Sequence, residues 1–181
     1  AAGAATALPL PDEVADAAVS GLMLNFVPEP ARAVTELARV TRPGGTAGVY
    51  VWDYTGEMQI LRHFWDAVRV LDPGAQALDE GTRFPICQPE PLRALFTAAG
   101  LADAKARPID VVTRFRDFDD YWLPFLGGQG PAAGYAMSLS DGPRAELRDL
   151  IRAGLPYDAD GSVPLAARAW AVRGRRSAKP A

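Results

Sequence analysis

The first third of the chain switches between two hydrophobic patterns. Residues 17–24 form an almost continuous apolar run, interrupted only by Ser20 and Gly21, which is typical of a parallel strand covered on both faces. The next apolar residues recur at helical spacing, so we expect an amphipathic helix over 30–41. A second apolar run covers 46–52. This order predicts one strand–helix–strand unit of an open α/β sheet.

Proline and glycine mark the boundaries of this unit. Pro30 stands where a first helical turn tolerates proline, because its missing N–H would have no partner there. The Arg42-Pro-Gly-Gly45 turn ends the helix, since proline cannot continue it and glycine accepts a left-handed conformation. Both signals agree with the hydrophobic pattern.

The rest of the chain predicts further helices and two strands around this unit. The helical patterns cover 57–71, 88–99, 117–126 and 140–153, and the strand patterns cover 101–115 and 162–173. We expect 75–87 to be a loop and 127–134 a flexible, hinge-like segment. Residues 175–181 are expected to form a disordered basic tail.

Composition limits the possible partners and compartments. The 181 residues carry a net charge of −3, which argues against broad binding to nucleic acid or to an anionic membrane surface. No apolar run approaches the roughly 20 residues needed to cross a bilayer. A single cysteine, Cys87, excludes an internal disulfide framework and a Cys-rich metal site. We therefore expect a cytoplasmic protein without a metal.

A set of short motifs gives the first indication of a family. In chain order they are Gly3-Ala-Ala-Thr-Ala-Leu-Pro-Leu-Pro-Asp12, Ala15-Asp16, Val19-Ser20, Asn25-Phe-Val-Pro28 and Arg42-Pro-Gly-Gly45. Their order and spacing over residues 3–52 resemble the class I S-adenosylmethionine-dependent methyltransferases. The branch most similar to these motifs acts on small molecules and includes the ubiquinone- and menaquinone-type enzymes.

This resemblance implies a fold, a cofactor and a reaction. The fold is the C-terminal half of a Rossmann-like methyltransferase sheet, mostly parallel with an antiparallel closing strand, flanked by helices. Residues 1–174 would be the C-terminal portion of a methyltransferase domain. The cofactor would be S-adenosylmethionine, and the reaction methyl transfer to a small-molecule acceptor.

The chain also departs from the family pattern. The turn acid that contacts the adenine amino group corresponds to Ala4, and Ala15 stands in place of a phenylalanine. No Gly-rich strand-to-helix turn precedes these motifs, nor does an acid that could bind the ribose hydroxyls. The family's sheet order, 3-2-1-4-5-7-6, would leave this chain only the 4-5-7-6 half.

This departure exposes one strand. Strand 17–24 would become an apolar sheet edge, which invites pairing with another chain, so a homodimer through the Ala17–Leu24 edge is one expectation. A longer gene product and a degenerate relative are the other two explanations.

The resemblance assigns cofactor contacts to two segments. The backbone of Ser20, Gly21 and Leu22, at the carboxyl end of a strand where open α/β sheets bind ligands, would line the methionine portion of the cofactor. Ala5 and Leu8 would border the adenine, beside the Ala4 position. The alternative for Gly21 is that it serves only close packing.

Candidate catalytic and acceptor-binding residues follow the second strand. Trp52 and Tyr54 flank Asp53, and an aromatic pair around an acid could hold a planar acceptor or stabilise a cationic methyl donor. The alternative is a strand end covered by the following helix. His63 is the only histidine and therefore the natural candidate for a general base, although helical geometry favours a solvated position for it.

The aromatic residues further along have two interpretations. Tyr121 and Trp122 could form an acceptor-binding lid hinged at the following glycines, with Trp65 also contacting the acceptor. Equally, an aromatic stripe at this spacing is ordinary hydrophobic core.

The sequence leaves three functional hypotheses. The first is methyl transfer from S-adenosylmethionine to a small-molecule acceptor. The second is a non-catalytic methyltransferase-like module that dimerises or regulates through its exposed strand edge. The third is a fragment of a nicotinamide oxidoreductase, which the missing Gly-rich fingerprint and Tyr-x-x-x-Lys pair disfavour.

Overall fold

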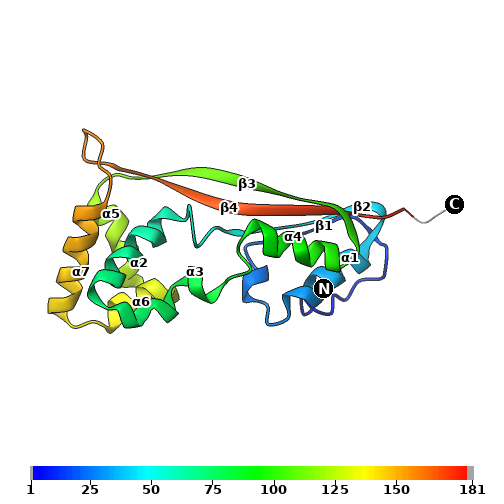
Figure 1. Ribbon diagram of the computed structural model, residues 1–181, viewed down its shortest axis with the longest axis horizontal. Coiled ribbons are helices and arrows are strands. Elements are labelled where there is room, and N and C mark those ends of the chain that lie inside the picture. The colour runs from blue at the N-terminus through cyan, green and yellow to red at the C-terminus, as the bar shows by residue number, and fades with distance from the viewer. Residues whose placement is uncertain (1, 179–181) are drawn as a thin grey trace. The chain divides into compact units, whose positions relative to one another are not determined.

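The computed structural model describes residues 2–178, which form an α/β fold with a mixed sheet (Figure 1). Within these residues the strand order is β1-β2-β4-β3. β1 and β2 pair in parallel, whereas β2 and β4 pair antiparallel, so the predicted α/β class and the antiparallel closing strand are confirmed. The strands are β1 (Ala15–Gly21), β2 (Thr41–Trp52), β3 (Leu101–Phe115) and β4 (Val163–Arg176).

The predicted helices are present, with additional short ones. The α-helices are α1 (Pro30–Val40), α2 (Gln59–Leu71), α3 (Glu80–Arg83), α4 (Pro89–Ala98), α5 (Phe118–Trp122), α6 (Gly130–Ser138) and α7 (Asp141–Gly154). The segment 75–87 was predicted to be a loop, but it contains α3 and most of a 3₁₀ turn, Pro73–Leu78. The predicted hinge at 127–134 contains the first half of α6. This helix is packed rather than flexible, because its small residues Ala132, Ala133 and Ala136 are buried.

The chain divides into two compact units. Unit 1 comprises Ala1–Trp52, Ile86–Ile109 and Ala169–Ala181, and unit 2 comprises Asp53–Pro85 and Asp110–Arg168. Unit 1 therefore contains β1, β2, α1 and α4, together with the beginning of β3 and the end of β4. Unit 2 contains the other α-helices.

In unit 1, α1 and α4 lie on one face of the sheet (Figure 1). Side chains alternate along each strand, so Ala47, Val49 and Val51 face these helices and are buried. On β1, Ala18 is buried, whereas Val19 is 67% exposed. The prediction that this strand is covered on both faces is wrong, because the described residues cover one face only.

The turn between α1 and β2 differs from the predicted helix stop. The helix ends at Val40, and β2 begins at once with Thr41 instead of residue 46. The pairing register slips between Ala15 and Ala17, whose partners are Thr41 and Thr46, so Arg42–Gly45 forms a bulge in the strand. Gly44 adopts the predicted left-handed conformation, with φ of 81°.

The end of β4 corrects the predicted tail. Arg175 and Arg176 belong to β4, so the strand extends into the segment expected to be disordered. The Arg176 guanidinium donates to the carbonyls of Ala38, Arg39 and Thr41 at 2.6–2.9 Å. These carbonyls lie at the C-terminus of α1, where the helix leaves acceptors without intrahelical partners. Residues 179–181 of the predicted tail lie outside the described residues.

Unit 2 is built around an aromatic core. Phe64 is fully buried and stacks on Phe125 with ring centroids 4.6 Å apart. Trp65 packs against Phe64 edge to face at 5.2 Å. The core also includes Leu147 and Ile151, both on α7, so α2 and α7 pack together through their apolar faces.

Candidate functional site

The carboxyl end of β1 contains the predicted cofactor-binding turn. Ser20 and Gly21 end the strand, and Leu22 adopts a left-handed conformation with φ of 53°, which turns the chain away from the sheet. The Leu22 N–H donates to the Tyr50 carbonyl at 2.8 Å. The turn is therefore held against the neighbouring strand β2.

Two buried polar atoms at this turn have no hydrogen-bond partner. They are the Ser20 hydroxyl oxygen and the Asn25 side-chain nitrogen, the latter in the 3₁₀ turn Leu24–Phe26 that follows β1. Buried polar groups in folded proteins are almost always hydrogen-bonded, and leaving one unpaired costs about 1–3 kcal/mol. The pair marks this turn as a place where a polar ligand has groups to bind.

Gly21 is required by the position of Tyr50. A Cβ atom at residue 21 would lie 2.3 Å from the Tyr50 hydroxyl oxygen, which is too close for any real contact. The absence of a side chain lets the tyrosine ring lie across the strand end. This contact supports a packing role for Gly21, and its contact with the cofactor stays a prediction.

The N-terminal turn is anchored on α1. Leu8 N–H donates to the Glu36 carboxylate at 2.8 Å, and Arg39 donates to the Leu8 carbonyl at 3.1 Å. Arg39 also contacts Glu36 and Asp12, and its hydrogen bond is the main reason that the pKa of Glu36 lies below its ordinary value. These contacts fix the predicted adenine-side segment, which contains Ala4 and Ala5, within unit 1.

The predicted acid Asp53 closes a turn. The residue is 5% exposed, and its carboxylate accepts from the backbone N–H groups of Gly56 and Glu57, each at 3.1 Å. The Thr55 hydroxyl donates to it at 3.4 Å. Because these bonds engage both oxygens, the geometry gives Asp53 a structural role. Trp52 is the half-buried last residue of β2 and belongs to unit 1, whereas Asp53 begins unit 2.

The predicted acceptor-binding aromatic residues are buried. Tyr54 is 7% exposed and lies against Phe84, Trp65 is 3% exposed, and Trp122 is 4% exposed. Tyr121 is fully buried, its hydroxyl donates to the Ile60 carbonyl at 2.7 Å, and burial raises its pKa above the ordinary range. The core interpretation accounts for these positions, and contact with an acceptor stays a prediction.

His63 is half-buried on α2, so the solvated position favoured by helical geometry is observed only in part. Burial lowers the pKa of its imidazole, and the nearby Asp66 carboxylate opposes that shift. The ring is therefore neutral at pH 7 and able to accept a proton. Its role as a general base stays a prediction.

Within residues 2–178, no group of three or more His, Cys, Asp or Glu residues is placed to hold a metal ion. None of the helices described there is long and apolar enough to cross a membrane.

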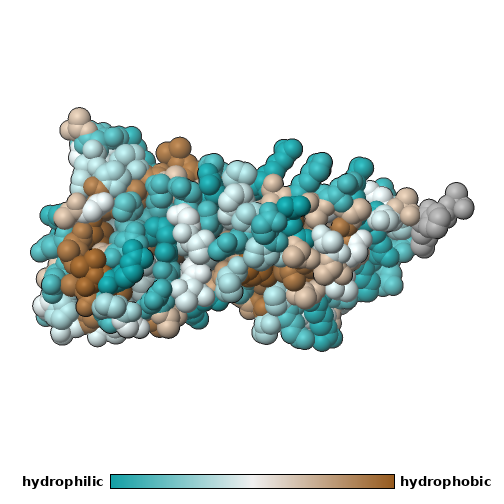
Figure 2. Space-filling view, viewed as in Figure 1, coloured by the Kyte–Doolittle hydropathy of each residue, from teal (hydrophilic) through white to brown (hydrophobic). Residues whose placement is uncertain are grey.

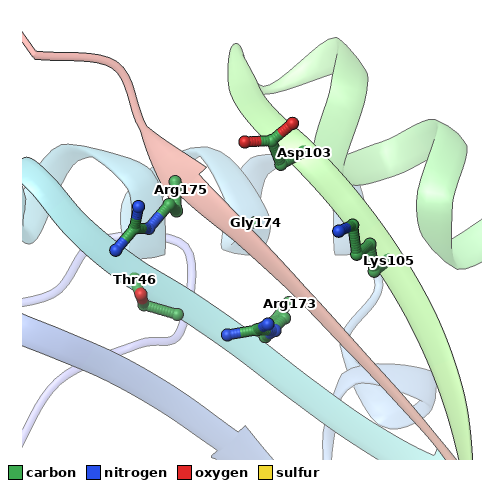
Figure 3. Close-up of a pocket in the computed structure, with 6 residues that line it drawn as sticks. All are labelled: Thr46, Asp103, Lys105, Arg173, Gly174 and Arg175. Atoms are coloured by element: carbon green, nitrogen blue, oxygen red, sulfur yellow. The ribbon is translucent and has the colours of Figure 1, made fainter.

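Sequence reasoning missed the second unpaired polar residue and a surface on the sheet. Asn25 belongs to the Asn25-Phe-Val-Pro28 motif, which predicts no role for its side chain. Exposed cationic side chains lie on the neighbouring strands β3 and β4, namely Lys105, Arg107, Arg173 and Arg175. In the space-filling view, hydrophilic side chains project from the sheet on the side away from the helices (Figure 2), and Figure 3 shows three of these cations around a cavity of about 320 Å³. These residues come close together only because β3 and β4 are neighbours in the sheet, and the sequence pattern does not predict that strand order.

Comparisons with known proteins first concern the N-terminal part of the chain. Residues 1–49 match the model of a methyltransferase domain. Uncharacterized proteins of Mycobacterium tuberculosis and Mycobacterium bovis are 44% identical to this chain over 52 residues, which are 29% of this chain. The matched segment spans only 19% of the length of those relatives.

Solved structures extend the similarity to nearly the whole chain. A candidate methyltransferase from Bacillus halodurans matches with a TM-score of 0.55 at 15% identity, over 97% of this chain and 70% of its own. A candidate type II methyltransferase from Anaeromyxobacter dehalogenans matches with a TM-score of 0.57 at 21% identity, over 99% and 72%. The chain therefore shares the fold of these solved structures, and its first 49 residues match the methyltransferase domain model.

Proposed function

We propose that this chain contributes to S-adenosylmethionine-dependent methyl transfer to a small-molecule acceptor. The observation that carries the proposal is the unpaired Ser20 hydroxyl at the carboxyl end of β1, inside the segment that matches a methyltransferase domain. The carboxyl ends of parallel strands are where open α/β sheets bind ligands. The finer assignment to the ubiquinone- and menaquinone-type branch rests on the sequence motifs alone.

The residues at this turn fit part of the cofactor. Ser20 and the backbone of Gly21 and Leu22 would hold the methionine portion, since they offer a hydroxyl and peptide groups to its polar atoms. Ala5 and Leu8 would border the adenine as apolar neighbours. Ala4 has no carboxylate for the adenine amino group, so adenine recognition here would rest on shape and apolar contact.

The chain's contribution to the chemistry is chiefly alignment. When bound, S-adenosylmethionine supplies an electrophilic methyl group, and transfer is an in-line displacement that depends on the positions of donor and acceptor. The hydrogen bond between the Leu22 N–H and the Tyr50 carbonyl fixes this turn, so the turn is suited to positioning the methyl donor. His63 is the candidate proton acceptor, because burial keeps its imidazole neutral at pH 7.

Calorimetric titration with S-adenosylhomocysteine tests the proposal. The 181-residue chain should bind weakly, and a polypeptide extended by the upstream coding sequence should bind tightly if that sequence supplies a Gly-rich turn and a ribose-binding acid. Under this proposal, residues 1–174 are the C-terminal portion of a methyltransferase domain. Absence of binding by both polypeptides would contradict the enzyme hypothesis.

The second candidate is a non-catalytic module that associates through β1. The observation favouring it is that β1 lies at the edge of the sheet, paired with β2 alone among the described residues. Such an edge presents backbone N–H and C=O groups to another strand. Light scattering at high protein concentration measures the outcome, since a dimer supports edge pairing and a persistent monomer contradicts it.

A further inference from the structure

The turn after β1 places a strained residue directly after a flexible one. Leu22 has a φ of 53°, in the left-handed region that residues with a side chain rarely adopt. Gly21, directly before it, belongs to the residue type with the greatest backbone freedom, because glycine has no Cβ. A strained conformation persists only where the surrounding structure holds it, so a neighbour must fix this turn.

Tyr50 on β2 holds the turn through its backbone. It is the partner of Gly21 in the register of the two parallel strands. Its carbonyl accepts the Leu22 N–H at 2.8 Å. A hydrogen bond to one amide fixes the position of that amide, but it does not select the backbone conformation of the glycine before it.

The Tyr50 side chain supplies the second restraint. The three atoms nearest to a Cβ built on Gly21 all belong to the side chain of Tyr50, and all lie within 2.8 Å of it. In other residues the Cβ excludes most backbone conformations through steric clashes, and glycine lacks those clashes. A ring in the place of the Cβ restricts the glycine from outside.

The backbone of residue 21 does not itself require glycine. Gly21 is not among the described residues that have a positive φ. An alanine could therefore adopt its conformation, and the atoms that oppose it most closely are those of Tyr50. Gly21 and Tyr50 thus form a complementary pair, in which the ring of one occupies the side-chain position of the other.

The two unpaired polar groups of this turn lie on either side of the pair. Ser20, whose hydroxyl has no partner, directly precedes Gly21, and Asn25 follows in the next 3₁₀ turn. Rotation about the backbone of Gly21 or Leu22 would move these two groups relative to each other. A restrained glycine keeps them in one arrangement.

From this we infer that Tyr50 is a positioning residue for the turn that would bind the methionine portion of S-adenosylmethionine. Its ring takes the place of a side chain at Gly21 and keeps Ser20 and Leu22 in their binding arrangement when no ligand is present. A site whose competent conformation is only partly populated binds more weakly in proportion to that fraction. The inference rests on the proposed function and assigns no part to the Tyr50 hydroxyl.

Two measurements on the ¹⁵N-labelled chain test the inference. One is hydrogen exchange of the Leu22 amide without ligand, and the other is the dissociation constant of S-adenosylhomocysteine from backbone amide shifts. Tyr50→Ala should speed this exchange and weaken binding at least about fivefold, because Leu22 can then leave the left-handed region. Tyr50→Phe keeps the ring and should leave both quantities within about twofold.

A second variant restores the restraint by another route. Gly21→Ala in the Tyr50→Ala background supplies a Cβ at residue 21, so it should recover part of the affinity and slow the Leu22 exchange again. A purely structural role of Tyr50 would not give this recovery. Tyr157→Ala is the control, since it removes a half-exposed tyrosine from unit 2 and should change neither quantity. Circular dichroism checks that each variant is folded.

Three results would overturn the inference and leave the proposed function intact. The first is unchanged S-adenosylhomocysteine affinity in Tyr50→Ala. The second is a loss in Tyr50→Phe as large as in Tyr50→Ala, since the hydroxyl would then be the group that acts. The third is a Gly21→Ala/Tyr50→Ala variant that binds no better than Tyr50→Ala. No binding by the unaltered chain or by the polypeptide extended upstream would contradict the proposed function, and the inference with it.

Discussion

Units 1 and 2 differ in how many of their polar and charged groups have a partner within the chain. Unit 2 buries its aromatic side chains in one core, and its arginines other than Arg83 pair with carboxylates. Unit 1 leaves one sheet face open, with unpaired cations and two unpaired buried polar atoms at the end of β1. In unit 2, one buried polar atom, Arg62 Nε, has no hydrogen-bond partner. More polar groups therefore lack a partner in unit 1, which also contains the proposed cofactor-binding turn. The following predictions test this contrast.

The largest expected effect is in the core of unit 2. Phe64→Ala removes a fully buried ring that stacks on Phe125 at 4.6 Å, so it should lower the free energy of unfolding by about 3–5 kcal/mol. Val70→Ala on the same helix is the control, since that side chain is 70% exposed. Urea denaturation measures both, and equal losses would show that unit 2 is not organised around this core.

A smaller loss is expected at the turn that Asp53 closes. Asp53→Ala leaves the Glu57 N–H without its acceptor and leaves the Gly56 N–H only the residue-53 carbonyl at 3.3 Å, which should cost about 1–3 kcal/mol in unfolding free energy. Asp149→Ala removes an exposed carboxylate and should change little. If urea denaturation shows the Asp53→Ala variant to be as stable as the unaltered chain, the structural role is contradicted and Asp53 is again a candidate catalytic acid.

The buried carboxylate of Glu80 should make stability depend on pH. Burial raises its pKa above 4.5, although the Trp65 indole donates to it and opposes the shift. The stability contribution is fully present below the unfolded-state pKa and is lost as pH rises through the raised folded-state pKa. Glu80→Gln should therefore remove this decline from the stability–pH profile, whereas Glu146→Gln should keep it. An unchanged profile for Glu80→Gln would contradict the assignment.

The smallest effect is expected at Gly21. Gly21→Ala forces the Tyr50 ring to move, so it should cost about 0.5–1.5 kcal/mol in unfolding free energy, and less when Tyr50→Ala is also present. Gly142→Ala is the control, because a Cβ there meets no atom within 4 Å. A full cost that persists in the double variant would show that Tyr50 is not the cause.

Sequence predicted the elements of unit 1 well because periodicity and turn residues agreed there. The helix at 30–41 and its proline start correspond to α1, and the 101–115 strand corresponds to β3. The pattern could not reveal that one face of β1 is open, since an apolar run indicates burial without saying what covers it. The bulge at Arg42–Gly45 was missed because proline and glycine in that position also mark a helix stop.

The site was harder to predict because spacing does not distinguish a packed aromatic residue from a ligand-binding one. Tyr121 and Trp122 have the same helical spacing in a core as in a lid, and only their burial separates the two. Asp53 has the position of a catalytic acid, but its oxygens accept hydrogen bonds from Thr55, Gly56 and Glu57. The unpaired Ser20 hydroxyl lies at the turn to which the resemblance assigns the cofactor, and the contact with the cofactor stays a prediction.

The central claim is that the turn after β1 binds the methionine portion of S-adenosylmethionine. The most direct measurement is a titration of the ¹⁵N-labelled 181-residue chain with S-adenosylhomocysteine, followed through backbone amide signals. The account predicts saturable shifts concentrated at Ser20, Gly21, Leu22 and Asn25, with the signals of Tyr121 and Trp122 in unit 2 unchanged. Shifts centred on unit 2, or none at millimolar ligand, would contradict it.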